Sequence, residues 1–297
     1  MKFAVVCAGG IGDALLMQIA SHHLQKLQVD VTTFSNHLPA LHEWFPKFHF
    51  TPQPSIDQIE ELFAPFDAIV LQHDNTPKAK RIRSLPKPVY TLYGSHLISK
   101  HGPLRPHLDV KFDPELSMAD NIRVAAQTLF PARATLVNGF TPLSGLVHRR
   151  HARRIAIHPT STLPAKNWLK ASFLELRDKL AKEGWDPVFV APPEEAQEWG
   201  SPLFPTLSEL AAFLYESAFF IGNDSGPGHL ASNGGIPTLT IGPSLAHLTL
   251  WRPGWHPGVI VHPPRWAHQF KLAKENWRFF ISVNHIIKQF KKLTAIK

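Results

Sequence analysis

The sequence predicts an α/β protein with two parallel β-sheets, each covered by helices on both faces. Short apolar runs typical of buried strands alternate along the 297 residues with segments whose apolar positions have helical spacing. Each half of the chain begins with a strand followed by a glycine-rich or polar loop, at residues 2–12 and 154–168. A chain of this length forms one large domain or two ordinary ones, and the hydrophobic share of 44% suffices for two cores.

The first half shows the alternation clearly. A glycine turn at residues 9–12 follows the first strand, and Asp13 begins a helix that extends to about Leu27. Residues 94–114 are rich in Gly and Pro, lack a period and predict a loop. The predicted strands are 2–8, 29–34, 68–71 and 89–92, and the predicted helices are 13–27, 38–45, 56–63, 78–84 and 118–129.

The second half repeats the pattern after a stretch rich in Pro, Gly and Arg, residues 131–154. We place the domain boundary within that stretch, which predicts domains 1–147 and 148–273, followed by a C-terminal helical segment, 274–297. The predicted strands are 154–158, 188–191, 218–221, 236–241 and 259–261, and the predicted helices are 171–183, 207–216 and 274–293, together with a short helix around residue 230.

The segment from Gly222 to Pro243 is the most informative part of the chain. Asp224 and Ser225 are good N-cap residues between a buried strand and the short helix, and a second strand follows. The first N–H groups of a helix have no partner within it, so this turn predicts a site for an anion such as a diphosphate. Gly226 and Gly228 let a ligand approach the backbone closely.

Composition narrows the functional classes. One cysteine, Cys7, excludes an internal disulfide framework and fits a reducing compartment. The N-terminus is interpreted as a strand and not as a signal peptide, and no uncharged apolar stretch is long enough to span a bilayer.

The chain has a net charge of +8. This charge favours binding of an anionic partner, although it is also consistent with a surface that only keeps the protein in solution. His148 and His151 have His-x-x-His spacing, but the surrounding arginines oppose a metal ion there.

Three separated segments resemble glycosyltransferase family 9, the lipopolysaccharide ADP-heptosyltransferases. They are the N-terminal Gly-Gly-Ile-Gly-Asp at residues 9–13, Lys-Asn-Trp at 166–168, and Asp-Ser-Gly-Pro-Gly-His at 224–229 with the following Gly-x-Pro and Gly-Pro-Ser. Ser225 stands where the family usually has Thr, which keeps the hydroxyl, and Cys7-Ala8 replaces a segment that commonly carries a basic residue. No segment in the middle of the first half matches the family.

The resemblance implies the GT-B arrangement: two Rossmann-like domains facing across a cleft, with the last helix crossing back to the N-terminal domain. It implies acceptor binding in the first domain and donor binding in the second. No Asp-x-Asp metal motif is present, and a helix N-terminus with a lysine can replace a divalent ion at the diphosphate, so we expect no metal and no cofactor besides the nucleotide-sugar donor.

Candidate site residues follow from the matched motifs. Asp13 is the candidate general base, because sugar transfer requires the acceptor hydroxyl to lose its proton as it attacks. A carboxylate near a helix N-terminus is equally favourable without any catalytic role. Gly10 and Gly12 shape the acceptor-side loop. The donor-side candidates are Thr160, Ser161, Thr162, Lys166, Glu195 or its neighbour Glu194, Asp224, Ser225, Gly226, His229 and Ser244.

These donor-side residues suggest separate roles. The resemblance implies that Lys166 holds the donor diphosphate, although most lysines are simply solvated. The amides of Ser225 and Gly226 are expected to face the diphosphate, and His229 is expected to donate a hydrogen bond to it. The alternative for His229 is a buried structural histidine whose hydrogen bonds go to the backbone. Asp224 is expected to orient its neighbours or cap the helix. Trp168 is expected to pack within the loop.

The predicted function is inverting transfer of a sugar, with heptose from ADP-heptose as the expected donor, to a lipopolysaccharide-core or related glycan acceptor. The protein is expected to be cytoplasmic and to contact the anionic inner membrane through its basic C-terminal helix and residues 149–154. The alternative is an NAD(P)-dependent oxidoreductase or epimerase acting on a nucleotide sugar, since the glycine turn follows a strand and opens a helix. The spacing does not match the Gly-x-Gly-x-x-Gly fingerprint of these enzymes, because Leu15 occupies the position of the third glycine when the pattern starts at Gly10. A nucleic-acid binder would need interleaved aromatic and basic residues, which are absent.

Overall fold

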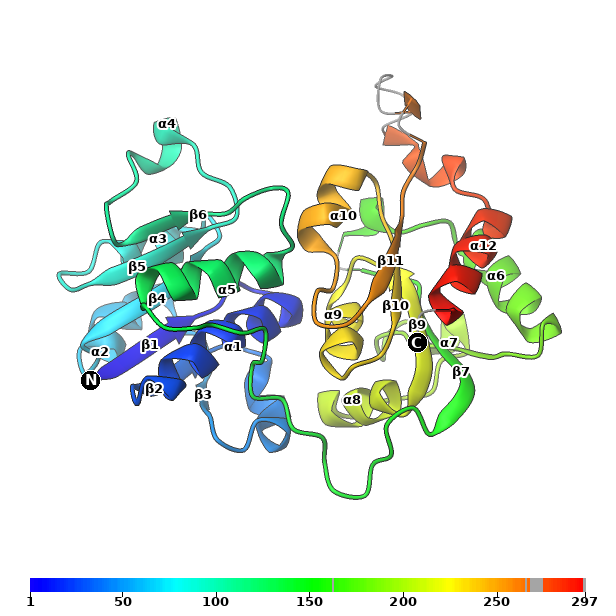
Figure 1. Cartoon of the computed structure of the whole chain (residues 1–297), viewed down its shortest axis with the longest axis horizontal. Coiled ribbons are helices and arrows are strands. Elements are labelled where there is room, and N and C mark those ends of the chain that lie inside the picture. The colour runs from blue at the N-terminus through cyan, green and yellow to red at the C-terminus, as the bar shows by residue number, and fades with distance from the viewer. Residues whose placement is uncertain (162, 265, 268–274, 296–297) are drawn as a thin grey trace. The chain divides into compact units, whose positions relative to one another are not determined.

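The chain folds into two compact units, Met1–Thr141 and Pro142–Lys297, seen in the computed structural model (Figure 1). The structure describes residues 1–161, 163–264, 266–267 and 275–295. Each unit contains one sheet in which every strand pair is parallel. The fold class predicted from the alternation of strands and helices is therefore confirmed. The observed division lies close to the boundary predicted at residue 147.

The first unit has a six-stranded sheet with the order β3-β2-β1-β4-β5-β6, the strand order of a dinucleotide-binding Rossmann fold. Its strands are β1 (Lys2–Val6), β2 (Asp30–Phe34), β3 (His49–Thr51), β4 (Ala68–His73), β5 (Val89–Tyr93) and β6 (Asp109–Lys111). Its helices are α1 (Ile11–Lys26), η1 (Leu38–Trp44), η2 (Ile56–Gln58), α2 (Ile59–Phe63), α3 (Pro77–Arg83), α4 (Ile98–His101) and α5 (Met118–Leu129).

The second unit has a five-stranded sheet with the order β11-β10-β9-β7-β8. Its strands are β7 (His151–His158), β8 (Asp186–Phe189), β9 (Ser217–Asn223), β10 (Thr238–Ile241) and β11 (Gly258–Val261). Its helices are η3 (Pro164–Lys166), α6 (Lys170–Lys182), α7 (Ala196–Trp199), α8 (Leu207–Tyr215), α9 (Gly226–Asn233), α10 (Leu245–Trp251), η5 (Trp277–Phe280) and α12 (Val283–Thr294).

Each sheet has one point where the chain reverses its direction of travel across the strands. In the first unit this point lies between β1 and β4, and in the second it lies between β7 and β9. Loops leaving the carboxyl ends of such a strand pair diverge to opposite faces, which opens a crevice where α/β proteins bind ligands. The glycine turn follows β1, and the Asp224–Ser225 turn follows β9. Topology alone thus places both predicted motifs at ligand-binding positions.

The strands β7 and β9 approach each other so closely that a side chain is excluded at Gly222. A Cβ there would lie 2.7 Å from the carbonyl oxygen of His158 and about as close to the Phe220 ring, at 3.0 Å. The glycine therefore permits the close contact between β7 and β9, just before the Asp224–Ser225 turn that follows β9.

The last helix, α12, packs its apolar face into the core of the second unit. Ile286, Phe290 and Leu293 are fully buried there, and the Phe290 ring lies 5.2 Å from those of Trp185 and Phe219. The described contacts of α12 are with α6, β10 and β11. This packing places the helix in the second unit, and its expected crossing back to the N-terminal domain stays a prediction.

Several elements differ from the sequence-based expectation. The single helix predicted at 274–293 is divided, because η5 ends before Ile281 and Ser282 caps α12 by accepting the N–H of His285 at 3.2 Å. Its predicted start, Lys274, lies outside the described residues. The strands β3 and β6, only three residues each, lie at sheet edges and were not predicted; β6 lies in the expected loop at 94–114. Among the described residues, no helix has both the length and the apolar character needed to cross a membrane.

Replacing Phe290 with Ala should lower the free energy of unfolding by about 3–5 kcal/mol, because the substitution leaves a cavity in the core. The matched control is Phe279→Ala, since the Phe279 side chain is 66% exposed and its loss should change stability by less than about 0.5 kcal/mol. Urea unfolding of both variants measures the difference. Equal effects of the two substitutions would show that α12 is not part of this core.

Candidate functional site

The turn between β9 and α9 presents the start of a helix to the crevice of the second sheet. Ser225 is the N-cap residue, and α9 begins at Gly226 with Pro227 next in its first turn. The Ser225 hydroxyl is buried and has no hydrogen-bond partner among the described residues. A buried hydroxyl without a partner beside the start of a helix is suited to donating to a bound anion.

Asp224, just before this turn, is surrounded by basic groups. Its carboxylate lies 2.8 Å from Nε2 of His247, 3.5 Å from Nζ of Lys166 and 3.9 Å from Nε2 of His229. Burial alone would raise the pKa of Asp224, but the hydrogen bonds and charges of the two imidazoles outweigh it and hold the pKa below its usual range. The aspartate therefore remains ionised and holds these basic side chains at the turn.

The loop 159–168, which carries Lys166, is fastened to the end of β9 by the buried side chain of Asn223. Asn223 Nδ2 donates to the carbonyl of Pro159 at 2.7 Å, and Oδ1 accepts from the N–H of Trp168 at 3.0 Å. Within the loop, the Ser161 hydroxyl donates to Oδ1 of Asn167 at 2.6 Å. The lysine thus extends from a braced loop, and 35% of its side chain is exposed.

A cavity of about 420 Å³ adjoins this turn, at the carboxyl ends of β7 and β8. Its wall is mainly apolar, and Pro227 of α9 forms part of it. The polar groups at the cavity come from Thr160, Ser161, Glu194, Glu195 and Thr206. A concave, mostly apolar space with a few polar groups is the usual form of a small-molecule site.

His158, the last residue of β7, lines the same cavity and is kept neutral by its surroundings. Burial lowers the pKa of His158 from 6.5 to about 4, although the hydrogen bond between Nδ1 and the carbonyl of Val190, at 2.6 Å, raises it in part. Nδ1 therefore carries the proton and donates to that carbonyl.

In the first unit, Asp13 lies in the first turn of α1 beyond the glycine turn. Its Oδ2 accepts a hydrogen bond from the N–H of Gly10 at 3.3 Å, and its Oδ1 accepts one from Nε2 of Gln72 at 2.6 Å. Gln72 is the penultimate residue of β4, and its Oε1 accepts the N–H of Ala8 at 3.0 Å. Gln72 of β4 thus bonds both to Asp13 and to the segment that leaves β1, at the reversal point of the sheet.

The structure brings most of the predicted donor-side residues to one edge of the second sheet. Lys166, Asp224, Ser225, Gly226 and His229 surround the start of α9, whereas Thr160, Ser161 and Glu195 line the adjoining cavity. Ser244 caps α10 by accepting the N–H of His247 at 3.2 Å, so it supports the histidine that contacts Asp224. Gly10 is the N-cap residue of α1, Gly12 and Asp13 lie in the first turn of that helix, and Thr162 lies outside the described residues.

Sequence reasoning missed four residues at these two edges: Gln72, His158, Asn223 and His247. Asn223 offered a signal, since an amide at the end of a buried strand beside a loop needs partners. His247 offered none, because its contact with Asp224 joins residues 23 positions apart. Among the described residues, no group of three or more His, Cys, Asp or Glu side chains is arranged to hold a metal ion.

The chain is similar in sequence to known glycosyltransferases. Residues 111–249 match the model of glycosyltransferase family 9 (heptosyltransferase). The lipopolysaccharide heptosyltransferase 3 of Escherichia coli is 27% identical over 132 residues, which are 39% of this chain and only 37% of that relative's length. The matched region contains the second and third of the three motifs, at residues 166–168 and 224–229, and the resemblance to this family is confirmed there.

Solved structures show the same fold over nearly the whole chain. A glycosyltransferase of family 9 from Veillonella parvula aligns with a TM-score of 0.71 at 17% identity, covering 100% of this chain and 97% of its own. The ADP-heptose lipopolysaccharide heptosyltransferase II of E. coli aligns with a TM-score of 0.69 at 15% identity, covering 99% of both chains. The GT-B class, with two parallel-sheet α/β domains, is thereby confirmed.

Acidification should weaken the folded state through His158. The unfolded chain takes up a proton on this histidine near pH 6.5, but the folded protein does so only near pH 4. The His158 contribution is therefore present above pH 6.5 and lost as the pH falls towards 4, by up to about 3 kcal/mol. Urea unfolding between pH 7 and 4.5 should show a smaller loss for His158→Asn, which keeps a donor for Val190.

The control for this comparison is His49→Gln, because His49 is exposed on β3. The free energy of unfolding of the His49→Gln variant should fall with decreasing pH by as much as that of the wild type. If the His158→Asn variant showed the same fall, His158 would not be the buried neutral group that causes it.

Proposed function

With the match to glycosyltransferase family 9 as the premise, we propose that this chain transfers a heptose from ADP-heptose to a lipopolysaccharide-core or related glycan hydroxyl. The observation that carries the proposal is the arrangement at the second sheet, where a helix start, a lysine and a nucleoside-sized cavity meet. The choice of ADP-heptose follows from the likeness in fold to the E. coli ADP-heptose lipopolysaccharide heptosyltransferase II, whose name gives this donor. The NAD(P)-dependent alternative has no comparable support.

The donor diphosphate would rest on the backbone amides of Ser225 and Gly226 and on the ammonium of Lys166. The helix start contributes N–H groups and partial positive charge, and the buried Ser225 hydroxyl lacks another partner among the described residues. His229 carries a buried Nδ1 that likewise has no partner in the described part of the chain. A diphosphate would satisfy groups that otherwise cost free energy where they are.

The nucleoside of the donor would occupy the adjoining cavity. Its apolar wall suits the faces of a base, and carboxylates at Glu194 and Glu195 would accept hydrogen bonds from the ribose hydroxyls. Pro227 belongs both to the cavity wall and to the first turn of α9. The nucleoside and diphosphate positions therefore adjoin, as they must for one ligand to fill both.

Asp13 is proposed as the general base of an inverting displacement. The acceptor oxygen attacks the anomeric carbon while the bond from that carbon to the diphosphate oxygen breaks and ADP leaves. The acceptor proton passes to the carboxylate of Asp13, which the amide of Gln72 and the N–H of Gly10 hold in orientation. Lys166 and the α9 amides stabilise the charge that develops on ADP, a role that would not require a divalent metal.

The proposed partners and location follow from the acceptor. A lipid-linked or oligosaccharide acceptor of this kind would bring the protein to the cytoplasmic face of the inner membrane. The excess of cationic residues, with a net charge of +8, favours such a surface over a neutral one.

Replacing Lys166 or Ser225 with Ala should weaken ADP binding by about 10- to 100-fold, since each substitution removes a donor to the diphosphate. Isothermal titration calorimetry measures the dissociation constant. Lys182→Ala, at the exposed end of α6, is the control and should bind ADP as the wild type does. EDTA should leave both binding and transfer unchanged. Unaltered ADP affinity in both site variants would disprove this donor site.

Replacing Asp13 with Asn should lower kcat by about 10²- to 10⁴-fold, because the amide cannot take the acceptor proton. ADP affinity should remain within about twofold of the wild type, because the donor site belongs to the other unit. Asp30→Asn, at the exposed start of β2, serves as the control for removal of one carboxylate. Release of ADP from ADP-heptose in the presence of acceptor is the measurement. Normal turnover by the Asp13→Asn variant would show that another group is the base.

A further inference from the structure

The segment between β5 and β6, residues 94–108, combines exposed apolar side chains with positive charge. Leu97 is 53% exposed, Ile98 73% and Leu104 40%. The segment contains Lys100, Arg105 and three histidines but no Asp or Glu. Its short helix, α4, lies at the end of a loop that projects from the sheet of the first unit (Figure 1). We call residues 97–104 the apolar tip.

Ion pairs fasten the base of this segment to the sheet. The Asp109 carboxylate is fully buried and accepts from Nη2 of Arg105 at 2.8 Å and from Nη2 of Arg83 at 3.1 Å. Arg105 also donates to the carbonyl of Val89 at 2.7 Å and to the hydroxyl of Thr91 at 3.0 Å. The base is therefore a network of ion pairs and hydrogen bonds around one buried carboxylate, and it fixes the point from which the apolar tip extends.

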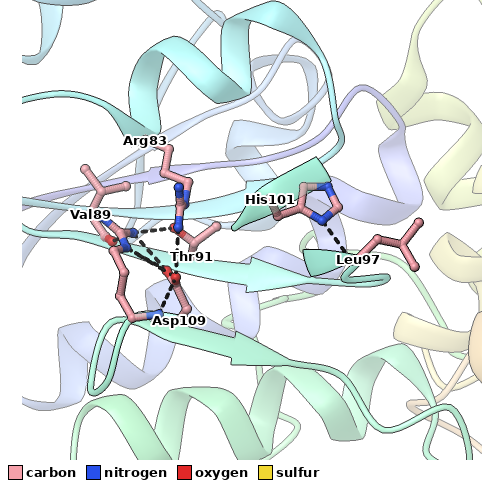
Figure 2. Close-up of polar contacts among 7 residues, drawn as sticks. Arg83, Val89, Thr91, Leu97, His101 and Asp109 are labelled. Atoms are coloured by element: carbon pink, nitrogen blue, oxygen red, sulfur yellow. Dashed lines mark hydrogen bonds and ion pairs between the residues drawn. The ribbon is translucent and has the colours of Figure 1, made fainter. Parts of the chain in front are cut away.

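The apolar tip has its own hydrogen bonds, away from this network. The N–H of Leu97 donates to Nδ1 of His101 at 2.9 Å, which closes a single turn (Figure 2). The N–H of His101 donates to the carbonyl of Leu97, and that of Gly102 to the carbonyl of Ile98, each at 2.9 Å. With this backbone satisfied locally, the turn holds the side chains of Leu97 and Ile98 out of the core of the first unit, where they remain exposed.

We propose that the apolar tip docks on an anionic lipid bilayer. Leu97 and Ile98 would enter the boundary between headgroups and acyl chains, and Lys100 would contact lipid phosphates. Residues 97–104 contain Lys100 and no Asp or Glu, so the apolar tip carries a positive charge that complements an anionic surface. A single helical turn is too short to cross the bilayer, so the contact is interfacial.

This inference deepens the proposed function by assigning the membrane contact to one segment, and it rests on that function only for a lipid-linked acceptor. Docking is measurable without any transfer reaction. A failure of docking therefore leaves the donor site untouched, and a failure of ADP binding leaves docking untouched.

The test is co-sedimentation of the full chain with vesicles of phosphatidylcholine alone or mixed with phosphatidylglycerol. The wild type should bind the mixed vesicles, and more weakly at high salt. The double substitution Leu97→Ser with Ile98→Ser should weaken binding at least about tenfold. Lys100→Glu should also weaken it, through repulsion from the anionic headgroups. Leu203→Ser is the matched control, because Leu203 is 69% exposed in the second unit, and it should bind like the wild type.

Unchanged melting temperature and ADP affinity would show that the variants are folded. Binding by the Leu97 and Ile98 double variant equal to that of the wild type, or no binding of the wild type to anionic vesicles, would overturn the proposal. Sedimentation equilibrium provides a separate check. Self-association of the wild type that the double substitution abolishes would identify a second copy of the chain as the occupant, and would also overturn it.

Discussion

The side-chain amide of Asn223 is the contact on which the edge of the second sheet depends. It pairs with Pro159 at one end of the loop 159–168 and with Trp168 at the other, so a single residue at the end of β9 fixes both ends. Removing it would leave a buried carbonyl and a buried N–H without partners, and such losses cost more than an ordinary hydrogen bond contributes. Because Asn223 immediately precedes the Asp224–Ser225 turn, the lysine loop and the helix start are braced against the same strand end.

The two units share one architecture but present opposite chemistry at their strand-reversal points. In the second unit an ionised aspartate gathers a lysine and two histidines beside a helix start, which favours an anion. In the first unit the glycine turn presents a carboxylate, held by an amide from the neighbouring strand. Two parallel sheets of the same kind thus carry a turn that favours negative charge in one unit and a turn that presents a carboxylate in the other, because the loops at their strand ends differ.

Much of the fold could be predicted from local patterns, and much of the site from three motifs. Apolar runs and caps predicted the longer strands and helices, since the central strands are buried at every residue and the helices bury one face. The short edge strands escaped because three residues such as Asp109–Lys111 carry no period. The apolar pattern continues across Ser282, the N-cap residue of α12, so the sequence predicted one helix where the structure has η5 and α12. The contacts of His247 and Gln72 depend on tertiary neighbours 23 and 59 positions away, which no local pattern reveals.

Pro227 affects more than the first turn of α9 in which it lies. A proline ring fixes its own φ and offers no N–H, so the opening turn of the helix is rigid before any ligand arrives. The same ring forms part of the wall of the neighbouring cavity. A ligand that filled the cavity and reached the helix start would therefore meet a turn that is already ordered, and its binding would not bear the entropy cost of ordering it.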